Sequence, residues 1–128
     1  MKKKKKPALC PCGSQLDYGD CCGRFHEGTP VPDALTLMKS RYSAFVKGRP
    51  DYLLKTWHES TRPHDLDLSE PVKWLGLEIL SSEVHGDHAT VSFVARGKIN
   101  GRAFKQVEKS RFVKENGQWF YLDGEVSK

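Results

Sequence analysis

Hydrophobic positions along the chain follow two different periods, and the first of them is helical. From Asp33 to Gly48 the apolar residues recur at steps of three and four, which is the spacing of an amphipathic helix. Asp33 is a suitable N-cap, while Gly48 and Pro50 end the pattern. Asp51 can cap a second, shorter helix that ends before Pro63. The apolar residues of the two helices are Leu35, Met38, Tyr42 and Phe45, then Tyr52, Leu53 and Trp57.

After residue 72 the pattern becomes that of strands. Two Asn-Gly pairs, Asn100-Gly101 and Asn116-Gly117, and one Gly86-Asp87 pair separate segments rich in β-branched and aromatic residues. Asn-Gly favours a tight hairpin because both central residues of a type I′ turn need positive φ. The segments are Trp74 to Val84, Ala89 to Gly97, Ala103 to Lys114 and Gln118 to Glu125. We therefore predict an α+β fold in which two helices cover one face of a curved, antiparallel sheet of about four strands.

The composition limits the chain to one ordinary domain with at most a small appendage. It has 128 residues, 38% of them hydrophobic, and a formal net charge of +5. Five consecutive lysines, Lys2, Lys3, Lys4, Lys5 and Lys6, account for that whole excess. Such a run is typical of a solvated, disordered tail, and it can also contact nucleic acid through phosphates. Because Pro7 and cysteines follow it, and no segment reaches the roughly 20 apolar residues of a membrane span, we expect a cytoplasmic protein without membrane contact.

All four cysteines of the chain, Cys10, Cys12, Cys21 and Cys22, fall in one short segment. In a reducing compartment such crowding favours a metal over disulfides, and four thiolates suit a closed, tetrahedral zinc site. The Cys-x-Cys and Cys-Cys spacings differ from the common Cys-x-x-Cys knuckle. His26 is near enough to replace Cys22 as the fourth ligand, so that alternative stays open; its other interpretation is a packing histidine.

The segment Cys10-Pro11-Cys12-Gly13-Ser14, followed by Tyr18 and Cys21-Cys22-Gly23, resembles the SEC-C motif, a short zinc-binding module. That resemblance implies that all four cysteines bind zinc. Segments further along the chain are similar to the YchJ family of uncharacterised bacterial proteins. They include Leu37 to Phe45, Asp51 to Leu53 with Thr56 to His58, Trp74 to Leu77, Val91 to Arg96, Ser110 to Phe112 and Glu115 to Trp119.

The family resemblance implies three parts: a basic tail over residues 1–9, a SEC-C module over 10–30, and a nuclear-transport-factor-2-like α+β cone over 31–128. Some members carry a second SEC-C motif at the C-terminus, and this sequence has none up to Lys128. A function that needs two zinc modules is therefore not expected. The family offers no established activity to transfer.

A cone of this kind often encloses a cavity, and the third strand segment places its residues on two faces. If one face points inward, Glu108 becomes a carboxylate among aromatic rings, able to accept a proton near His58 or Asp123. The alternative is an outward Glu108 that pairs with a basic residue on the next strand. The face in question carries Phe104, Gln106, Glu108, Ser110 and Phe112.

Two arginines and one histidine complete the cavity candidates. Arg41 and Arg111 can hold an anionic group, although arginines of this kind are commonly structural ion-pair partners. His58 lies near a helix end, where a protonated imidazole also favours the negative end of the helix dipole.

Two main hypotheses follow for the function. The first is a non-enzymatic adaptor that docks a protein or ribosomal partner through the cysteine module and the lysine tail. The second is a small-molecule binder, or an enzyme of the hydrolase or isomerase type, that uses the cone cavity. Nucleic-acid binding through the lysine tail is a third hypothesis. It has the least support, because the basic charge is confined to one tail and no aromatic residues are interleaved with the lysines.

Overall fold

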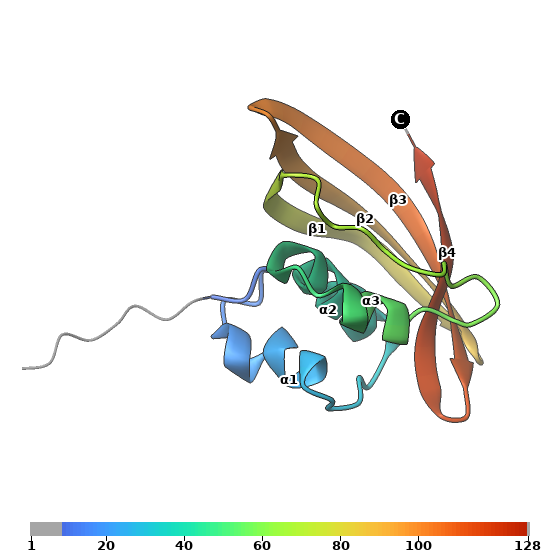
Figure 1. Ribbon diagram of the computed structural model, residues 1–128. Helices are drawn as coiled ribbons and strands as arrows, with labels where there is room; N and C mark the ends of the chain where they lie inside the picture. The colour runs from blue at the N-terminus through green and yellow to red at the C-terminus, as the bar shows by residue number, and fades with distance from the viewer. Residues whose placement is uncertain (1–8, 128) are drawn as a thin grey trace, which may run out of the picture.

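The computed structural model describes residues 9–127, and the lysine tail predicted at positions 2–6 lies outside them. The chain forms a short helical segment, then two longer helical elements, then four consecutive strands (Figure 1). The elements are η1 (Tyr18–Asp20), α1 (Cys22–His26), α2 (Ala34–Lys47), α3 (Pro50–Lys55), β1 (Val72–His85), β2 (His88–Ile99), β3 (Arg102–Glu115) and β4 (Gln118–Ser127). The α+β class predicted from the sequence is confirmed.

Helix α2 begins and ends where the pattern predicts. The Asp33 carboxylate accepts a 2.7 Å hydrogen bond from the Thr36 N–H, and Gly48 closes the helix with a φ of 68°. Helix α3 differs from the prediction, because Asp51 lies within its first turn and Arg49 is the N-cap. Pro50 explains the shift, since its fixed φ suits the first helical position.

Helix α3 ends at Lys55, so Trp57 is not on a helix as predicted. Trp57 instead forms an isolated parallel bridge with Tyr121 of β4. The backbone N–H of Tyr121 donates to the Thr56 carbonyl over 2.9 Å, and the His58 N–H donates to the Tyr121 carbonyl over 2.8 Å. The segment that follows α3 is therefore held against the last strand of the sheet.

The four strands form one antiparallel sheet in the order β1-β2-β3-β4. Both predicted Asn-Gly hairpins are present, with φ values of 52° and 81° at Asn100 and Gly101 and of 53° and 77° at Asn116 and Gly117. Positive φ at both central positions is the requirement of a type I′ turn, and it explains why these two pairs stand at the turns. The strands extend one or two residues beyond the predicted segments at most of their ends.

The sheet curves around α2, which lies on its concave face (Figure 1). The inner positions of β2 alternate along the strand and are buried against α2, as are Phe112 and Trp119 from the neighbouring strands. Helix α2 contributes Ala34, Leu37, Met38 and Tyr42 to this core. Phe112 and Leu37 are 1% and 0% exposed, so they lie at its centre.

The cysteine-rich segment packs on the side of α2 that faces away from the sheet (Figure 1). Phe25 joins a small core with Ala44 of α2 and with Tyr52 and Leu53 of α3. His26 Nε2 lies 2.8 Å from the Ser40 carbonyl oxygen. The module is thus attached to the cone through α2. Among residues 9–127 no helix is both long and apolar enough to cross a membrane.

Candidate metal centre and cone pocket

The four cysteines converge on one point of the N-terminal module. Their Sγ atoms all lie within 4.8 Å of one another, and the Sγ atoms of Cys12 and Cys21 are 3.7 Å apart. Gly13 makes the turn after Cys12 with a φ of 92°, and its N–H donates to the Cys10 carbonyl over 3.2 Å. This turn brings the first pair of cysteines back towards the second pair at the start of α1.

The cluster has the dimensions of a tetrahedral metal site. Four ligands at about 2.3 Å from a zinc ion would have sulfur–sulfur distances of about 3.8 Å, and the 3.7 Å between Cys12 and Cys21 agrees with this value. Ser14 Oγ donates to Cys21 Sγ over 3.1 Å, which is the outer hydrogen bond that commonly orients a thiolate ligand. The residues therefore fit a metal ion with sulfur ligands.

Burial and mutual contact change the acidity of these thiols. The Cys22 thiol donates to Cys12, which lowers the pKa of Cys12 and raises the pKa of Cys22. Burial raises the pKa of Cys21. Cys10, Cys12 and Cys22 are buried, and Cys10 Sγ lies 3.5 Å from Ser43 Oγ of α2. Without a metal, a thiolate in this cluster is stabilised by hydrogen bonds from neighbouring groups. A metal ion would stabilise all four cysteines as thiolates.

His26, the alternative fourth ligand, lies outside this cluster. Its Nε2 donates to the Ser40 carbonyl, which can only accept, and its Nδ1 accepts a 2.5 Å hydrogen bond from the Tyr18 hydroxyl. Both ring nitrogens are therefore engaged. The histidine is 6% exposed, and burial lowers its pKa. His26 is a packing histidine that connects the module to α2.

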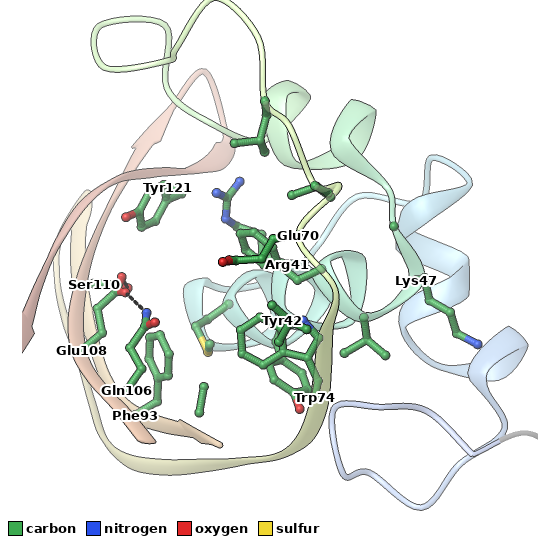
Figure 2. A pocket seen from close by; sticks show the side chains of 18 of the residues that line it. Arg41, Tyr42, Lys47, Glu70, Trp74, Phe93, Gln106, Glu108, Ser110 and Tyr121 are labelled. Atoms are coloured by element: carbon green, nitrogen blue, oxygen red, sulfur yellow. Dashed lines mark hydrogen bonds between the residues drawn. The ribbon is translucent and has the colours of Figure 1, made fainter. Parts of the chain in front are cut away.

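A pocket of about 850 Å³ opens between α2, the concave face of the sheet and the segment that joins α3 to β1. Aromatic side chains form much of its wall, and polar side chains face each other across it (Figure 2). Leu66, Leu68 and Glu70 of the joining segment form one side of the opening. The aromatic lining residues are Tyr42, Phe45, Trp57, Trp74, Phe93, Phe104, Phe112 and Tyr121.

Arg41 projects from α2 into this pocket (Figure 2). It is 6% exposed, and its Nη1 donates to the Leu53 carbonyl and to Thr56 Oγ1, both over 2.7 Å. Its guanidinium carbon lies 4.4 Å from the centre of the Tyr121 ring and 5.1 Å from that of Trp57. Burial lowers the pKa of Arg41 to about 10, so the side chain remains charged at neutral pH.

Glu108 points into the pocket from β3, on the wall opposite α2 (Figure 2). Its Oε1 accepts a 3.0 Å hydrogen bond from Gln106 Nε2, and its Oε2 accepts a 2.7 Å bond from Ser110 Oγ. Burial and the nearby Glu108 carboxylate raise the pKa of Tyr121 to about 12. The alternative of an outward Glu108 paired with a basic residue is thus wrong.

The carboxylate of Glu108 rests against the backbone of Gly124 in β4. A Cβ atom at position 124 would touch Glu108 Oε2 and lie 3.0 Å from its Cδ. Ser110 pairs with Gly124 across the two strands, so the glycine leaves the space that the carboxylate occupies. Strand alternation in the sequence predicts that Gln106 and Ser110 share the face of Glu108. It does not identify Gly124 or the joining segment, because their contacts with the pocket depend on how distant parts of the chain pair.

Two of the four cavity candidates lie elsewhere. Arg111 is exposed on the outer face of the sheet, where its Nε donates to Asp123 over 2.6 Å. His58 Nε2 lies 3.0 Å from Glu115 Oε2, in a small depression apart from the cone pocket. The expectation that His58 or Asp123 would lie near Glu108 was wrong, because both side chains point away from the concave face. Of the four candidates, Arg41 and Glu108 are the two that line the pocket.

A cysteine cluster suited to a metal, joined to a helix-on-sheet cone with an internal pocket, defines the class: a small metal-binding module fused to a cone domain. The comparisons with known proteins agree with this class. Residues 7–24 match the SEC-C motif, and residues 33–124 match the "YchJ, middle NTF2-like domain". The chain belongs to the UPF0225 family of YchJ-like proteins.

Relatives of the chain are similar over nearly their whole length. A UPF0225 protein of Bordetella parapertussis is 54% identical over 98% of this chain and 99% of its own. A UPF0225 protein of Methylibium petroleiphilum is 54% identical over 96% of this chain and 92% of its own.

Two solved structures have the same fold. The solution structure of a SEC-C motif containing protein from Rhodopseudomonas palustris superposes with a TM-score of 0.83 at 31% identity, over 94% of this chain and 100% of that protein. The crystal structure of a SEC-C motif containing protein from Psychrobacter arcticus gives a TM-score of 0.78 at 30% identity, over 94% of this chain and 83% of that one. These matches support the fold and the module of this chain.

Proposed function

We propose that this protein binds a small organic molecule in the cone pocket and that its metal is a structural zinc ion. The observation that carries the proposal is the placement of Arg41 and Glu108 on facing walls of an aromatic pocket of about 850 Å³. Volumes of roughly 300 to 1,000 Å³, apolar walls and a few inward polar groups are typical of small-molecule sites.

The support favours binding over catalysis. Glu108 was expected to act with His58 or Asp123 as an acid–base pair, and both of these lie outside the pocket. Without such a partner, the Glu108 carboxylate supplies a hydrogen-bond acceptor and a charge that orient a ligand.

The pocket can be tested with two neighbouring residues of β3 that face opposite sides of the sheet. Gln106 lines the pocket, whereas Lys105 is exposed on the other face. We expect Gln106→Trp to narrow the pocket and weaken binding of the neutral dye N-phenyl-1-naphthylamine, measured by its fluorescence. Lys105→Trp is the matched control and should bind the dye like the wild type. Equal binding by the wild type and Gln106→Trp would contradict the proposal.

Zinc is supported by the chemistry of the donor set. Four cysteine sulfurs that lie within 4.8 Å of one another would fill all four positions around a zinc ion, and closed sites of this kind are structural. Elemental analysis of protein purified without chelator should give one zinc ion per chain, with thiols that react only after chelation. Four freely reactive thiols in metal-free, folded protein would refute the zinc site.

A second proposal retains the adaptor function, with a protein or ribosomal partner bound by the cysteine module. Leu9 and Leu16 of the module are 55% and 52% exposed, which supports a contact surface there. A pull-down with Leu9→Ser and Leu16→Ser combined should lose partners that the wild type retains, while Leu80→Ser, an exposed leucine on β1, should keep them. Identical partner lists for all three proteins would remove this proposal.

A further inference from the structure

The pocket contains a buried cation, Arg41, that forms no ion pair among residues 9–127, although the carboxylates of Glu108, Asp67 and Glu70 also line the pocket. Arg41 is 6% exposed, and its two hydrogen bonds both leave from Nη1 towards uncharged oxygens. The ion pairs among residues 9–127 involve other arginines or His58. Aromatic faces and carbonyl oxygens compensate part of the cost of such a burial, but a buried charge normally has a counter-charge.

Burial lowers the pKa of Arg41, and the carboxylate of Glu108 partly offsets this because it attracts the Arg41 charge across the pocket, but the two side chains form no ion pair. Both oxygens of Glu108 accept hydrogen bonds from neighbours on its own strand, Gln106 and Ser110, and the group rests against Gly124. This arrangement holds Glu108 on the sheet wall, away from an ion pair with Arg41. The hydrogen-bonding capacity of Glu108 is thus partly used by the protein, whereas the Nε and Nη2 edge of Arg41 has no acceptor among the described residues.

A second donor beside Arg41 also lacks an acceptor. Trp57 lines the pocket, its ring lies under the Arg41 guanidinium at 5.1 Å, and its indole Nε1 is a buried N–H without a hydrogen bond in the described chain. Buried donors in folded proteins are nearly always satisfied by protein, water or ligand. The Trp57 N–H is fully enclosed, so it shows that donors at this end of the pocket lack acceptors but is not itself open to a ligand. The donor edge of Arg41 is therefore the group that an acceptor on a ligand would meet.

We infer that the ligand of the cone pocket is an organic anion with a single negative charge, such as a carboxylate, on an aromatic or otherwise apolar body. This inference rests on the proposed small-molecule function. The anionic group meets the free edge of Arg41, whose planar fork suits a two-oxygen acceptor. The apolar body packs against Trp74 and Phe93. Glu108 on the opposite wall disfavours a second negative charge and accepts a hydrogen bond from a donor group of the ligand.

Two dyes with one scaffold test the charge directly. N-Phenyl-1-naphthylamine is neutral, and 8-anilinonaphthalene-1-sulfonate is the same molecule with one sulfonate. We expect the anionic dye to bind the wild type at least tenfold more tightly than the neutral dye in a fluorescence titration. In Arg41→Gln this ratio should fall to about twofold or less, because a neutral amide replaces the guanidinium. Arg111→Gln is the matched control, since this arginine lies on the outer face; it should keep the wild-type ratio.

The outcomes separate the two proposals. If neither dye binds the wild type, the small-molecule function itself is overturned. If the neutral dye binds and the anionic dye binds no more tightly, the small-molecule function is supported and the proposal of an anionic ligand is refuted. A preference for the anionic dye that persists in folded Arg41→Gln would also refute the assignment to Arg41. If Arg41→Gln does not fold, the ratio in Arg41→Lys, which keeps the charge without the fork, should lie between those of the wild type and unity.

Discussion

The contact between Gly124 and Glu108 gives a prediction whose size follows from the structure. In Gly124→Ala the new methyl group would lie 3.0 Å from Glu108 Cδ and 3.2 Å from its Cγ, in addition to touching Oε2. The carboxylate must then leave its position and give up hydrogen bonds from Ser110 and Gln106. Hydrogen bonds to a charged group contribute about 1.5–3 kcal/mol each. A strand Gly→Ala change without a clash stabilises by about 0.5–1 kcal/mol.

The net expectation is that Gly124→Ala lowers the free energy of unfolding by about 2–5 kcal/mol, measured by urea denaturation with tryptophan fluorescence as the signal. Gly76→Ala in β1 is the control, because a methyl group there would meet nothing within 4 Å, and it should be neutral or slightly stabilising. In a Glu108→Ala background the clash is absent, so Gly124→Ala should no longer destabilise. A coupling energy below about 0.5 kcal/mol between the two substitutions would show that the carboxylate does not rest on Gly124.

Other predictions concern the histidine, the core, the metal and the tail. Burial lowers the pKa of His26, so its contribution to stability is complete above about pH 6.5 and is lost as the pH falls towards the lowered value. In urea unfolding, the free energy of unfolding of His26→Gln should therefore fall less steeply on acidification than that of the wild type. An equal dependence on pH in the two proteins would contradict this. Phe112→Ala should cost about 3–5 kcal/mol in the same assay, whereas a cost below about 1 kcal/mol would place Phe112 outside the core. Chelation should lower the melting temperature by calorimetry, and an unchanged temperature after verified metal loss would argue against a structural ion. Deleting residues 1–6 should abolish salt-sensitive RNA binding in a filter assay, and retained binding would place the contact elsewhere.

Those parts of the fold that depend on local signals could be predicted from the sequence. The helix from Asp33 to Gly48 carries its own N-cap and left-handed C-terminal glycine, and the two Asn-Gly pairs select their hairpin turns without help from the rest of the chain. Helix α3 is the exception, because Asp51 and Pro50 both give N-terminal signals and the ring of Pro50 decided the start. Boundaries shift where local signals at neighbouring positions compete.

Strand alternation predicted only those residues of the candidate site that lie on β3. Glu108, Gln106 and Ser110 lie on one face because they are two residues apart, and this face is the inner one. The same alternation places Arg111, three positions from Glu108, on the opposite face, so the two could not have shared one pocket. His58 was misplaced for a different reason: its position depends on how the chain leaves α3 and pairs with Tyr121, a long-range contact that no local pattern encodes.

Helix α2 links the cysteine cluster to the pocket, so the two proposed sites, a structural metal and a ligand pocket, share one element of this short chain. Ser40 and Ser43 face the module, where they meet His26 and Cys10, while Arg41 between them faces the pocket. A cone this small has little core with which to fix the rotation of its single long helix, and a rotation of α2 by one residue would remove the guanidinium from the pocket. The contacts of His26 with Ser40 and of Cys10 with Ser43 restrain this rotation from the side of α2 that faces the module. If both proposals hold, loss of the metal should weaken ligand binding through the position of Arg41, although no cysteine lines the pocket.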